Sequence, residues 1–366
     1  MGIQGPVTRG DLSKGSGFAQ DQPCARIAAV SAPEPRASLP NEPIGSSLIT
    51  GFLGSGKTTL LNRLLRHPGM GDTAVIVNEF GEIGLDHLLI ETALDSAVLL
   101  KSGCLCCTLR GDLVDTLASL YDRRQRGEVP AFRRVLIETT GLADPAPILH
   151  ALMADAAVTA HYRMDHVIAT VDAVNALGQL AEHYESAKQA AVADRLVLTK
   201  SDLASPAEIV TVTARLRALN ATAPILGAVN GAIEPDALFG PSTGEWASRV
   251  PETEPYAHAY RAHHDHHHGI SSFVLVRDEP LPWPALARWL ESLASLRGPD
   301  LLRVKGIVNV QGRSRPVVIH AVQHVLHPPR ELSDWPDGDR RSKIVFITRD
   351  IGGAALEKSF RAAVAA

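Results

Sequence analysis

The segment from Gly51 to Thr58 reads GFLGSGKT and directly follows the apolar run 47–50. It fits the pattern G-x-x-x-x-G-K-[ST], whose glycines let backbone N–H groups surround phosphates at the start of a helix. Lys57 adds a positive charge for the terminal phosphates, and the Thr58 hydroxyl is a magnesium ligand. The spacing therefore predicts a site for a nucleoside triphosphate and magnesium.

A carboxylate that follows a buried strand would be the second part of such a site. The run RRVLIETTG places Glu138 at the end of an apolar stretch and Gly141 three residues later. Enzymes with this phosphate loop hold magnesium partly through a carboxylate in this position. We therefore expect Glu138 near the magnesium, and Gly141 where the backbone approaches the terminal phosphate.

The sequence TKSD, Thr199 to Asp202, also follows an apolar run and could recognise the base. The Asp202 carboxylate can accept hydrogen bonds from the ring N–H and the exocyclic amine of guanine, a pair of donors that adenine lacks in that arrangement. The aliphatic stem of Lys200 would lie along the base. In this position behind a phosphate loop, the motif favours GTP over ATP.

Three cysteines, Cys104, Cys106 and Cys107, lie between the apolar stretch 97–100 and a predicted helix start near Gly111. Three thiolates suit zinc, copper(I) or cobalt and leave a fourth position for a carboxylate, a histidine, water or a partner's ligand. A closed structural zinc site and a redox thiol pair are the alternatives.

Composition limits the class of protein. The chain has 366 residues, enough for about two domains, with 45% apolar and 21% charged residues. No stretch approaches the roughly 18 consecutive apolar residues of a membrane span, and the N-terminus lacks the apolar core of a signal peptide. The formal net charge of −4 provides no basic field for nucleic acid or an anionic membrane. We therefore expect a cytoplasmic protein without either partner.

Short apolar runs alternate with helical patterns after residue 46. The predicted strands are 47–50, 73–78, 97–100, 133–139, 165–172, 194–200 and 223–229. Near-continuous apolar strands in such alternation predict an α/β domain with a mostly parallel sheet and helices on both faces. Leucines at 60, 61, 64 and 65, and at 113, 117 and 120, each mark one face of a helix.

A second block begins after a Pro-rich, acidic stretch. Its predicted strands are 270–277, 301–310, 315–325 and 343–349, with helices at about 283–296 and 351–365, which indicates a smaller α+β domain. The predicted organisation is a flexible arm (1–46), a nucleotide domain (47–232), a linker (233–269) and a C-terminal domain (270–366).

These motifs together resemble the CobW/YjiA-type P-loop GTPases, whose signature is GCxCC between the phosphate loop and E-x-x-G, followed by [NT]-K-x-D. The similarity extends through NEFGEIGLD (78–86), ETTGLADP (138–145), VDAV (171–174) and LLRVKGIVNV (301–310), so it covers nearly everything after the arm. The resemblance implies a P-loop fold with a CobW-type C-terminal domain. It also implies a GTP-dependent metallochaperone that delivers zinc, cobalt or iron to client metalloproteins.

The resemblance also implies residue roles. It assigns phosphate and magnesium contacts to Gly51, Gly54, Ser55, Gly56, Lys57, Thr58 and Thr59, the magnesium region to Glu138, the guanine contacts to Lys200 and Asp202, and the transported metal to Cys104, Cys106 and Cys107. Segment 78–82 would sense the terminal phosphate, with Glu82 as a further catalytic and metal-binding candidate. Two departures stand out, because Val77 replaces a metal-binding Glu of some members and Thr199 replaces the commoner Asn.

Six of the 15 histidines lie between His258 and His268. Neighbouring neutral imidazoles can hold loosely bound zinc, nickel or cobalt, although a solvated linker without function is the simpler interpretation. For His320, His324 and His327, core or surface roles are at least as plausible as ligation.

The preferred hypothesis is a nucleotide-gated metal carrier with slow intrinsic GTP hydrolysis. The alternatives are a nickel-insertion maturation GTPase, a metal sequestration or sensing module with a structural nucleotide, and a small-molecule kinase. The sequence leaves the metal, the client and the oligomeric state open.

Overall fold

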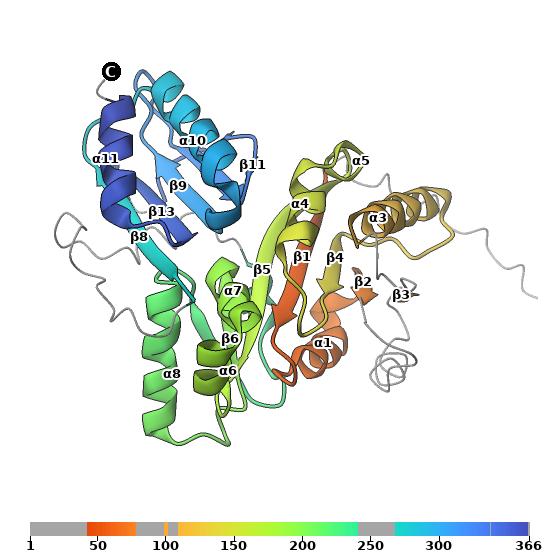
Figure 1. Ribbon diagram of the computed structural model, residues 1–366. Coiled ribbons are helices and arrows are strands. Elements are labelled where there is room, and N and C mark those ends of the chain that lie inside the picture. The colour runs from red at the N-terminus through yellow and green to blue at the C-terminus, as the bar shows by residue number, and fades with distance from the viewer. Residues whose placement is uncertain (1–41, 78–98, 102–108, 241–267, 337, 365–366) are drawn as a thin grey trace, which may run out of the picture. The chain divides into compact units, whose positions relative to one another are not determined.

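The computed structural model describes residues 42–77, 99–101, 109–240, 268–336 and 338–364, and Glu42–Ala366 forms one compact unit. Two β-sheets organise it (Figure 1). The first has seven strands, all paired in parallel, and the second has six strands in antiparallel pairing. The expected fold class, an α/β nucleotide-binding fold followed by a smaller α+β part, is confirmed.

The first sheet runs in the order β3-β2-β4-β1-β5-β6-β7. Its strands are β1 (Ile44–Gly51), β2 (Thr73–Val77), β3 (Leu99–Lys101), β4 (Arg134–Glu138), β5 (Tyr162–Asp172), β6 (Arg195–Thr199) and β7 (Ile225–Ala228). The helices are α1 (Lys57–Leu65), η1 (Pro68–Met70), α3 (Leu109–Arg126), α4 (Ala146–Ala154), α5 (Ala156–Thr159), α6 (Ala176–Glu182), α7 (Tyr184–Val192), α8 (Pro206–Leu219) and α9 (Pro235–Phe239). Because β1 lies between β4 and β5, the ends of three strands meet beside the phosphate loop.

Alternation along the central strands sorts their apolar side chains between two helical layers. Leu48, Val135, Val167 and Leu196 pack on one face, and Ile49, Leu136, Ile168 and Val197 pack on the other. Helices α3, α4, α7 and α8 cover the first face, whereas α1 and α9 cover the second. The strands are therefore buried on both faces, which explains their near-continuous apolar sequences.

The second sheet runs β11-β10-β9-β13-β8, with β12 paired to β10. Its elements are β8 (Ile270–Arg277), α10 (Trp283–Arg297), η3 (Gly298–Asp300), β9 (Arg303–Val308), β10 (Val317–Val322), β11 (Val325–Leu326), β12 (Arg330–Glu331), β13 (Ser342–Arg349) and α11 (Gly353–Val364). Trp289 of α10 and Phe360 of α11 pack with Phe346 of β13 in one apolar core. The two helices thus cover one face of this sheet (Figure 1).

Three boundaries differ from the sequence prediction. β1 begins at Ile44, inside the stretch assigned to the arm, because residues 44–46 pair with β5. α9 and its buried Leu238 fall within the predicted linker and pack on the first sheet. The run 315–325 is two strands, since Gln323 has φ 52° and reverses the chain between β10 and β11.

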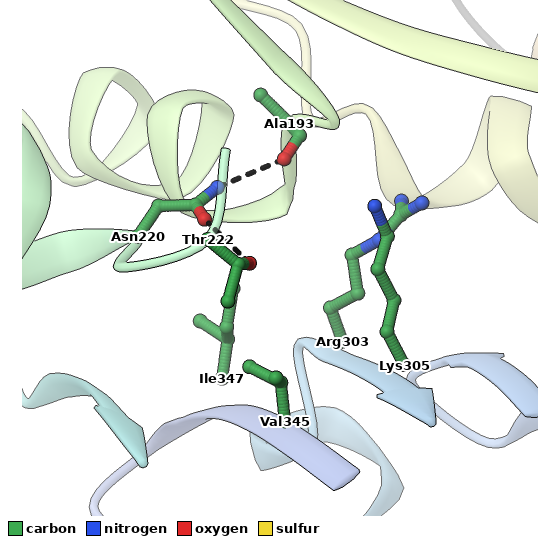
Figure 2. A pocket seen from close by; sticks show the side chains of 7 residues that line it. All are labelled: Ala193, Asn220, Thr222, Arg303, Lys305, Val345 and Ile347. Atoms are coloured by element: carbon green, nitrogen blue, oxygen red, sulfur yellow. Dashed lines mark hydrogen bonds between the residues drawn. The ribbon is translucent and has the colours of Figure 1, made fainter. Parts of the chain in front are cut away.

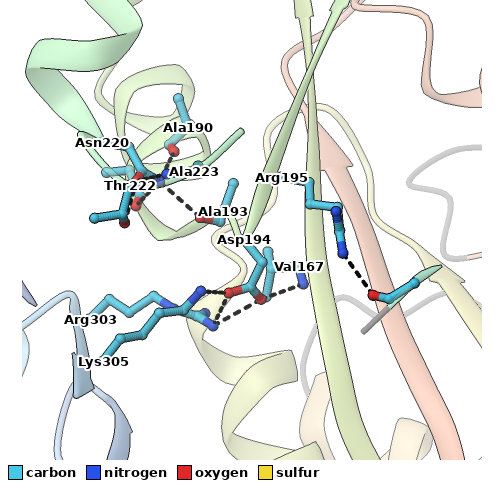
Figure 3. Close-up of polar contacts among 12 residues, drawn as sticks. Val167, Ala190, Ala193, Asp194, Arg195, Asn220, Thr222, Ala223, Arg303 and Lys305 are labelled. Carbon is cyan, nitrogen blue, oxygen red and sulfur yellow. Dashed lines mark hydrogen bonds and ion pairs between the residues drawn. The ribbon is translucent and has the colours of Figure 1, made fainter. Parts of the chain in front are cut away.

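A buried ion cluster joins the two sheets. The Asp194 carboxylate accepts hydrogen bonds from Arg303 Nη2 at 2.7 and 2.9 Å and from the backbone N–H of Val167 at 2.8 Å, and it also contacts Lys305 (Figure 3). Burial would raise the pKa of Asp194, but Arg303 and Lys305 hold it below its usual range. Burial lowers the pKa of Lys305 to about 8, against the attraction of Asp194.

Replacing Asp194 with Ala should destabilise the protein, because the charge of Arg303 then stays buried without its carboxylate. We expect a loss of about 3–5 kcal/mol in the free energy of unfolding, measured by urea titration at pH 7. The matched control is Asp165→Ala, which removes a more exposed ion pair with Arg163 and should change stability by less than about 1 kcal/mol.

The contribution of Asp194 to the free energy of unfolding should depend on pH. Since the folded pKa of Asp194 lies below its unfolded value, the stabilisation is complete between about pH 4 and the pKa of Lys305, about 8, and it is lost as the pH falls toward the folded pKa of Asp194. A difference between the unaltered chain and Asp194→Ala that grows on acidification would contradict this account.

Candidate nucleotide-binding site

The phosphate loop begins where β1 ends, in a conformation that needs glycine. Gly51 has φ 140°, and a Cβ there would lie 2.3 Å from Thr170 Oγ1 and 2.8 Å from Ser55 Oγ. Those two hydroxyls hydrogen-bond to each other at 2.6 Å. Gly56 is the N-cap of α1 with φ 90°, a left-handed conformation that glycine adopts without strain. These contacts set the path of the loop.

Lys57 is largely buried within the loop that precedes it, with 8% of its surface exposed. Its Nζ donates to the backbone carbonyl oxygens of Gly51 at 2.9 Å and Phe52 at 3.1 Å. The loop thus curls around an ammonium group, which suits a site for phosphate charge.

The side chains of Thr58 and Glu138 are in contact at the end of β4, the strand that pairs with β1. Parallel pairing puts Glu138 opposite Ile49, and the Thr58 hydroxyl donates to Glu138 Oε1 at 2.9 Å. Glu138 is 5% exposed. A hydroxyl and a carboxylate beside a phosphate loop are hard oxygen ligands, so these residues fit magnesium bound together with phosphate.

The segment after β4 lies against the phosphate loop. A Cβ on Gly141 would lie 2.6 Å from Leu53 Cδ2 and 2.7 Å from the Leu53 backbone nitrogen. Thr139 also binds β1, because its N–H donates to the Ile49 carbonyl oxygen at 3.0 Å and its hydroxyl to Thr50 Oγ1 at 3.0 Å. Gly141 therefore lies in close contact with the phosphate loop, and its approach to the terminal phosphate stays a prediction.

The TKSD segment lies behind the same loop. The Thr199 hydroxyl donates to the carbonyl oxygen of Ser55 at 2.8 Å, which ties the end of β6 to the phosphate loop. Lys200 has φ 54°, and its Nζ donates to Asp172 Oδ2 at 2.7 Å. Asp202 is exposed to solvent. The structure brings Thr199 and Ser55 together, and the role of Asp202 in base recognition stays a prediction.

Asp172 and Thr170 contact candidate site residues, although the sequence patterns assign neither of them a role. Burial would raise the pKa of Asp172, but hydrogen bonds from Lys200, Asn175 and the Val174 backbone lower it. Asp172 thus stays charged and fixes the Lys200 ammonium. The only signal in the sequence is that both residues lie near the end of the predicted strand 165–172, because the pairing of β5 with β1 is known only from the structure.

The predicted transition-metal ligands Cys104, Cys106, Cys107 and Glu82 lie outside the described residues, as do segment 78–82 and most of the histidine run. Within the described ranges, no group of three or more His, Cys, Asp or Glu side chains could hold a metal ion.

The C-terminal histidines have local contacts. His324 packs edge-on against His150, with ring centroids 4.2 Å apart, and His327 Nδ1 lies 3.1 Å from the Pro328 carbonyl oxygen. Burial, with Lys305 and Arg303 nearby, lowers the pKa of His320 to about 3, so this imidazole is neutral at physiological pH.

A small pocket lies between the two sheets (Figure 2). Asn220 and Thr222 line it on one side, and Arg303, Lys305, Val345 and Ile347 line it on the other. It has room for about one water molecule. The pocket is too small for a nucleotide.

Comparison with known families agrees with this geometry. Residues 46–227 match the CobW/HypB/UreG nucleotide-binding domain, and residues 270–364 match the cobalamin synthesis protein CobW C-terminal domain. The chain belongs to the CobW family. The family model for the first domain includes the phosphate loop, Glu138 and the TKSD segment.

Relatives of this CobW-family chain match it along most of its length. The zinc chaperone YjiA of Escherichia coli is 36% identical over 327 residues, which cover 88% of this chain and 98% of that protein. The zinc chaperone CobW of Pseudomonas aeruginosa is 29% identical over 382 residues, covering 94% and 98%. The crystal structure of Zn(II)-bound YjiA GTPase from E. coli matches with a TM-score of 0.65 at 32% identity, covering 88% and 98%.

Among the helices in the described part of this CobW-family chain, none has the length and apolar character that a membrane span needs.

Replacing Gly141 with Ala should push the segment after Glu138 away from Leu53. We expect kcat/KM for GTP to fall about tenfold or more, because small displacements beside a reacting group are costly. The matched control is Gly178→Ala on α6, where an added Cβ meets nothing within 4 Å. Equal kcat/KM values for the two variants would refute a role for this close approach.

Proposed function

We propose that this CobW-family chain binds and hydrolyses GTP, producing GDP and phosphate at a slow intrinsic rate, and uses that cycle to control metal transfer. The main support is the contact between Thr58 and Glu138 at 2.9 Å beside the phosphate loop. Relatives that match nearly the full chain are named a GTPase and zinc chaperones.

The chain's own residues have separate roles in this proposal. Glycines 51, 54 and 56 let backbone N–H groups face the phosphates, and Lys57 offsets their negative charge. Ser55, Thr58 and Thr59 extend the contacts to phosphate and magnesium, and Glu138 lies beside Thr58. When bound, magnesium neutralises charge that develops on the phosphates. Thr199, Lys200 and Asp202 would bind guanine.

The transported metal would bind at Cys104, Cys106 and Cys107, with Glu82 as a further ligand. Thiolates favour zinc and similar soft or borderline ions over magnesium. We prefer zinc as the transported metal because relatives are named zinc chaperones. Cobalt and iron are the other candidates. The recipient is a client metalloprotein in the cytoplasm.

GTP should tighten zinc binding if the nucleotide controls the cargo, and zinc should then tighten GTP binding by the same factor. The measurement is competition with a chromophoric chelator, on protein loaded with GDP or with a non-hydrolysable GTP analogue and magnesium. We expect at least about fivefold tighter binding with the analogue, and loss of this difference in the Cys106→Ser, Cys107→Ser variant. Equal affinity in both nucleotide states would favour a sequestration module with a structural nucleotide.

Replacing Asp202 with Asn should weaken guanine recognition, because an amide donor would face the two donors of the base. We expect GTP affinity to fall at least about tenfold, from the loss of hydrogen bonds to a charged group, and affinity for xanthosine triphosphate to rise. Asp278→Asn, at an exposed position in the C-terminal part, is the control. Unchanged base preference in Asp202→Asn would exclude this residue from the base site.

A further inference from the structure

Helix α7 (Tyr184–Val192) carries polar side chains in positions where an ordinary helix would carry apolar ones. Every residue from Ser186 to Val192 is buried, including Lys188 at 5% and Gln189 at 1% exposure. The C-terminal end of α7 is also held, because Asn220 Nδ2 donates to the carbonyl oxygens of Ala190, Ala191 and Ala193 at 2.8–3.1 Å (Figure 3). The helix is therefore fixed from several sides.

Two of these buried side chains bind the segment that follows Glu138. Gln189 Nε2 donates to the carbonyl oxygens of Gly141 at 3.1 Å and Ala143 at 3.0 Å. Lys188 Nζ donates to Asp144 Oδ2 at 2.7 Å. Gly141 lies against Leu53 of the phosphate loop, so α7 holds this segment at the place where it contacts that loop.

The start of α7 touches the phosphate loop itself. The His183 ring, at the N-cap of α7, stacks on Phe52 with centroids 4.6 Å apart. Phe52 also supplies one of the carbonyl oxygens that bind Lys57. The phosphate loop and segment 141–144 therefore both depend on the position of α7.

On its other side, α7 contacts the C-terminal sheet through Tyr184. Arg349 of β13 donates from Nη1 to the Tyr184 hydroxyl at 3.2 Å and from Nη2 to Asp300 Oδ1 at 2.8 Å. The Arg349 guanidinium and the Lys188 ammonium lie 5.5 and 5.7 Å from the Tyr184 ring centroid. Both distances are within the range of attraction between a cation and an aromatic ring. Tyr184 thus connects Arg349 to Lys188.

We propose that Lys188 and Gln189 are positioning residues for GTP hydrolysis, and that Arg349 of the C-terminal sheet acts on them through Tyr184. The proposal rests on the GTPase function proposed above. Lys188 and Gln189 bind the segment after Glu138, whereas the phosphate loop and the TKSD segment would hold the nucleotide. Removing the Lys188 or Gln189 contacts leaves the stacking of His183 on Phe52 in place, so it should slow hydrolysis with little effect on nucleotide binding.

This arrangement gives the C-terminal sheet control over the nucleotide site. A protein that binds this sheet and moves Arg349 would change the rate of hydrolysis.

The test compares Lys188→Ala and Arg349→Ala with the unaltered chain, using kcat and KM for GTP and the Kd for GDP. We expect kcat to fall at least about fivefold in both variants, with KM and Kd within about twofold. The matched control is Arg277→Ala. Like Arg349, Arg277 binds a carboxylate, Glu357, and lies over an aromatic ring, Phe360, but both partners belong to the C-terminal part.

Two further variants separate positioning from loss of fold. Lys188→Arg keeps a cation for Asp144 and should recover most of kcat. Tyr184→Phe keeps the ring and removes only the hydroxyl that Arg349 contacts, so it should lower kcat less than Arg349→Ala does. The double variant of Lys188→Ala and Arg349→Ala should be no slower than the slower single variant, since both act along one connection.

The possible failures are distinct. Unchanged kcat in Lys188→Ala and Arg349→Ala, or a rise in KM with unchanged kcat, overturns this inference and leaves the GTPase proposal intact. If kcat of the double variant falls by the product of the two single-variant factors, the two residues act independently, and the connection through Tyr184 is overturned. Absence of GTP hydrolysis in the unaltered chain overturns the proposed function, and this inference with it.

Discussion

The parallel pairing of β1 with β4 on one side and β5 on the other is the constraint on which the nucleotide site depends. Parallel strands end at the same edge of a sheet, so Gly51, Glu138 and Thr170 arrive together although they are far apart in sequence. The hydroxyl pair of Ser55 and Thr170 and the bond from Thr58 to Glu138 then fix the loop on that edge. Glycine at position 51 is required because this approach leaves no room for a side chain.

Buried charge has a different role at the junction with the second sheet. A cluster of Asp194, Arg303 and Lys305 gains less net stability than apolar packing would, since each charge loses its hydration. The cluster does fix how the two sheets are aligned, because any other alignment of β9 against the start of β6 would leave charges buried without partners. The hydrogen bond from Arg349 to Tyr184 also joins the second sheet to α7 through one specific pair of side chains, nearer the nucleotide site. The connection between the sheets is thus specific in its geometry.

The sequence predicted the elements better than their contacts. Local patterns predicted nearly every strand and placed Glu138 and Gly141 just after a strand that ends beside the phosphate loop, because spacing and apolar runs are properties of neighbouring residues. They could not give the strand order, or the partners of Lys188 and Gln189, which lie 44 to 48 residues away along the chain. Asp172 was overlooked for a related reason, since an acidic residue at a strand end shows its partner Lys200 only after folding. The assignments of the cysteines and Glu82 remain predictions.

The junction described above also bears on how the chain responds to cleavage. Apolar residues of the C-terminal part, including Ile270, Leu302 and Ile347, belong to the same buried cluster as Leu196 and Leu216 of the nucleotide-binding part. Each part alone would expose this apolar surface and leave one side of the Asp194 cluster without its counter-charge. A peptide bond cut between β7 and β8 should therefore leave two fragments that remain associated. The same two fragments, produced from separate messages, should find each other and reassemble into the intact fold.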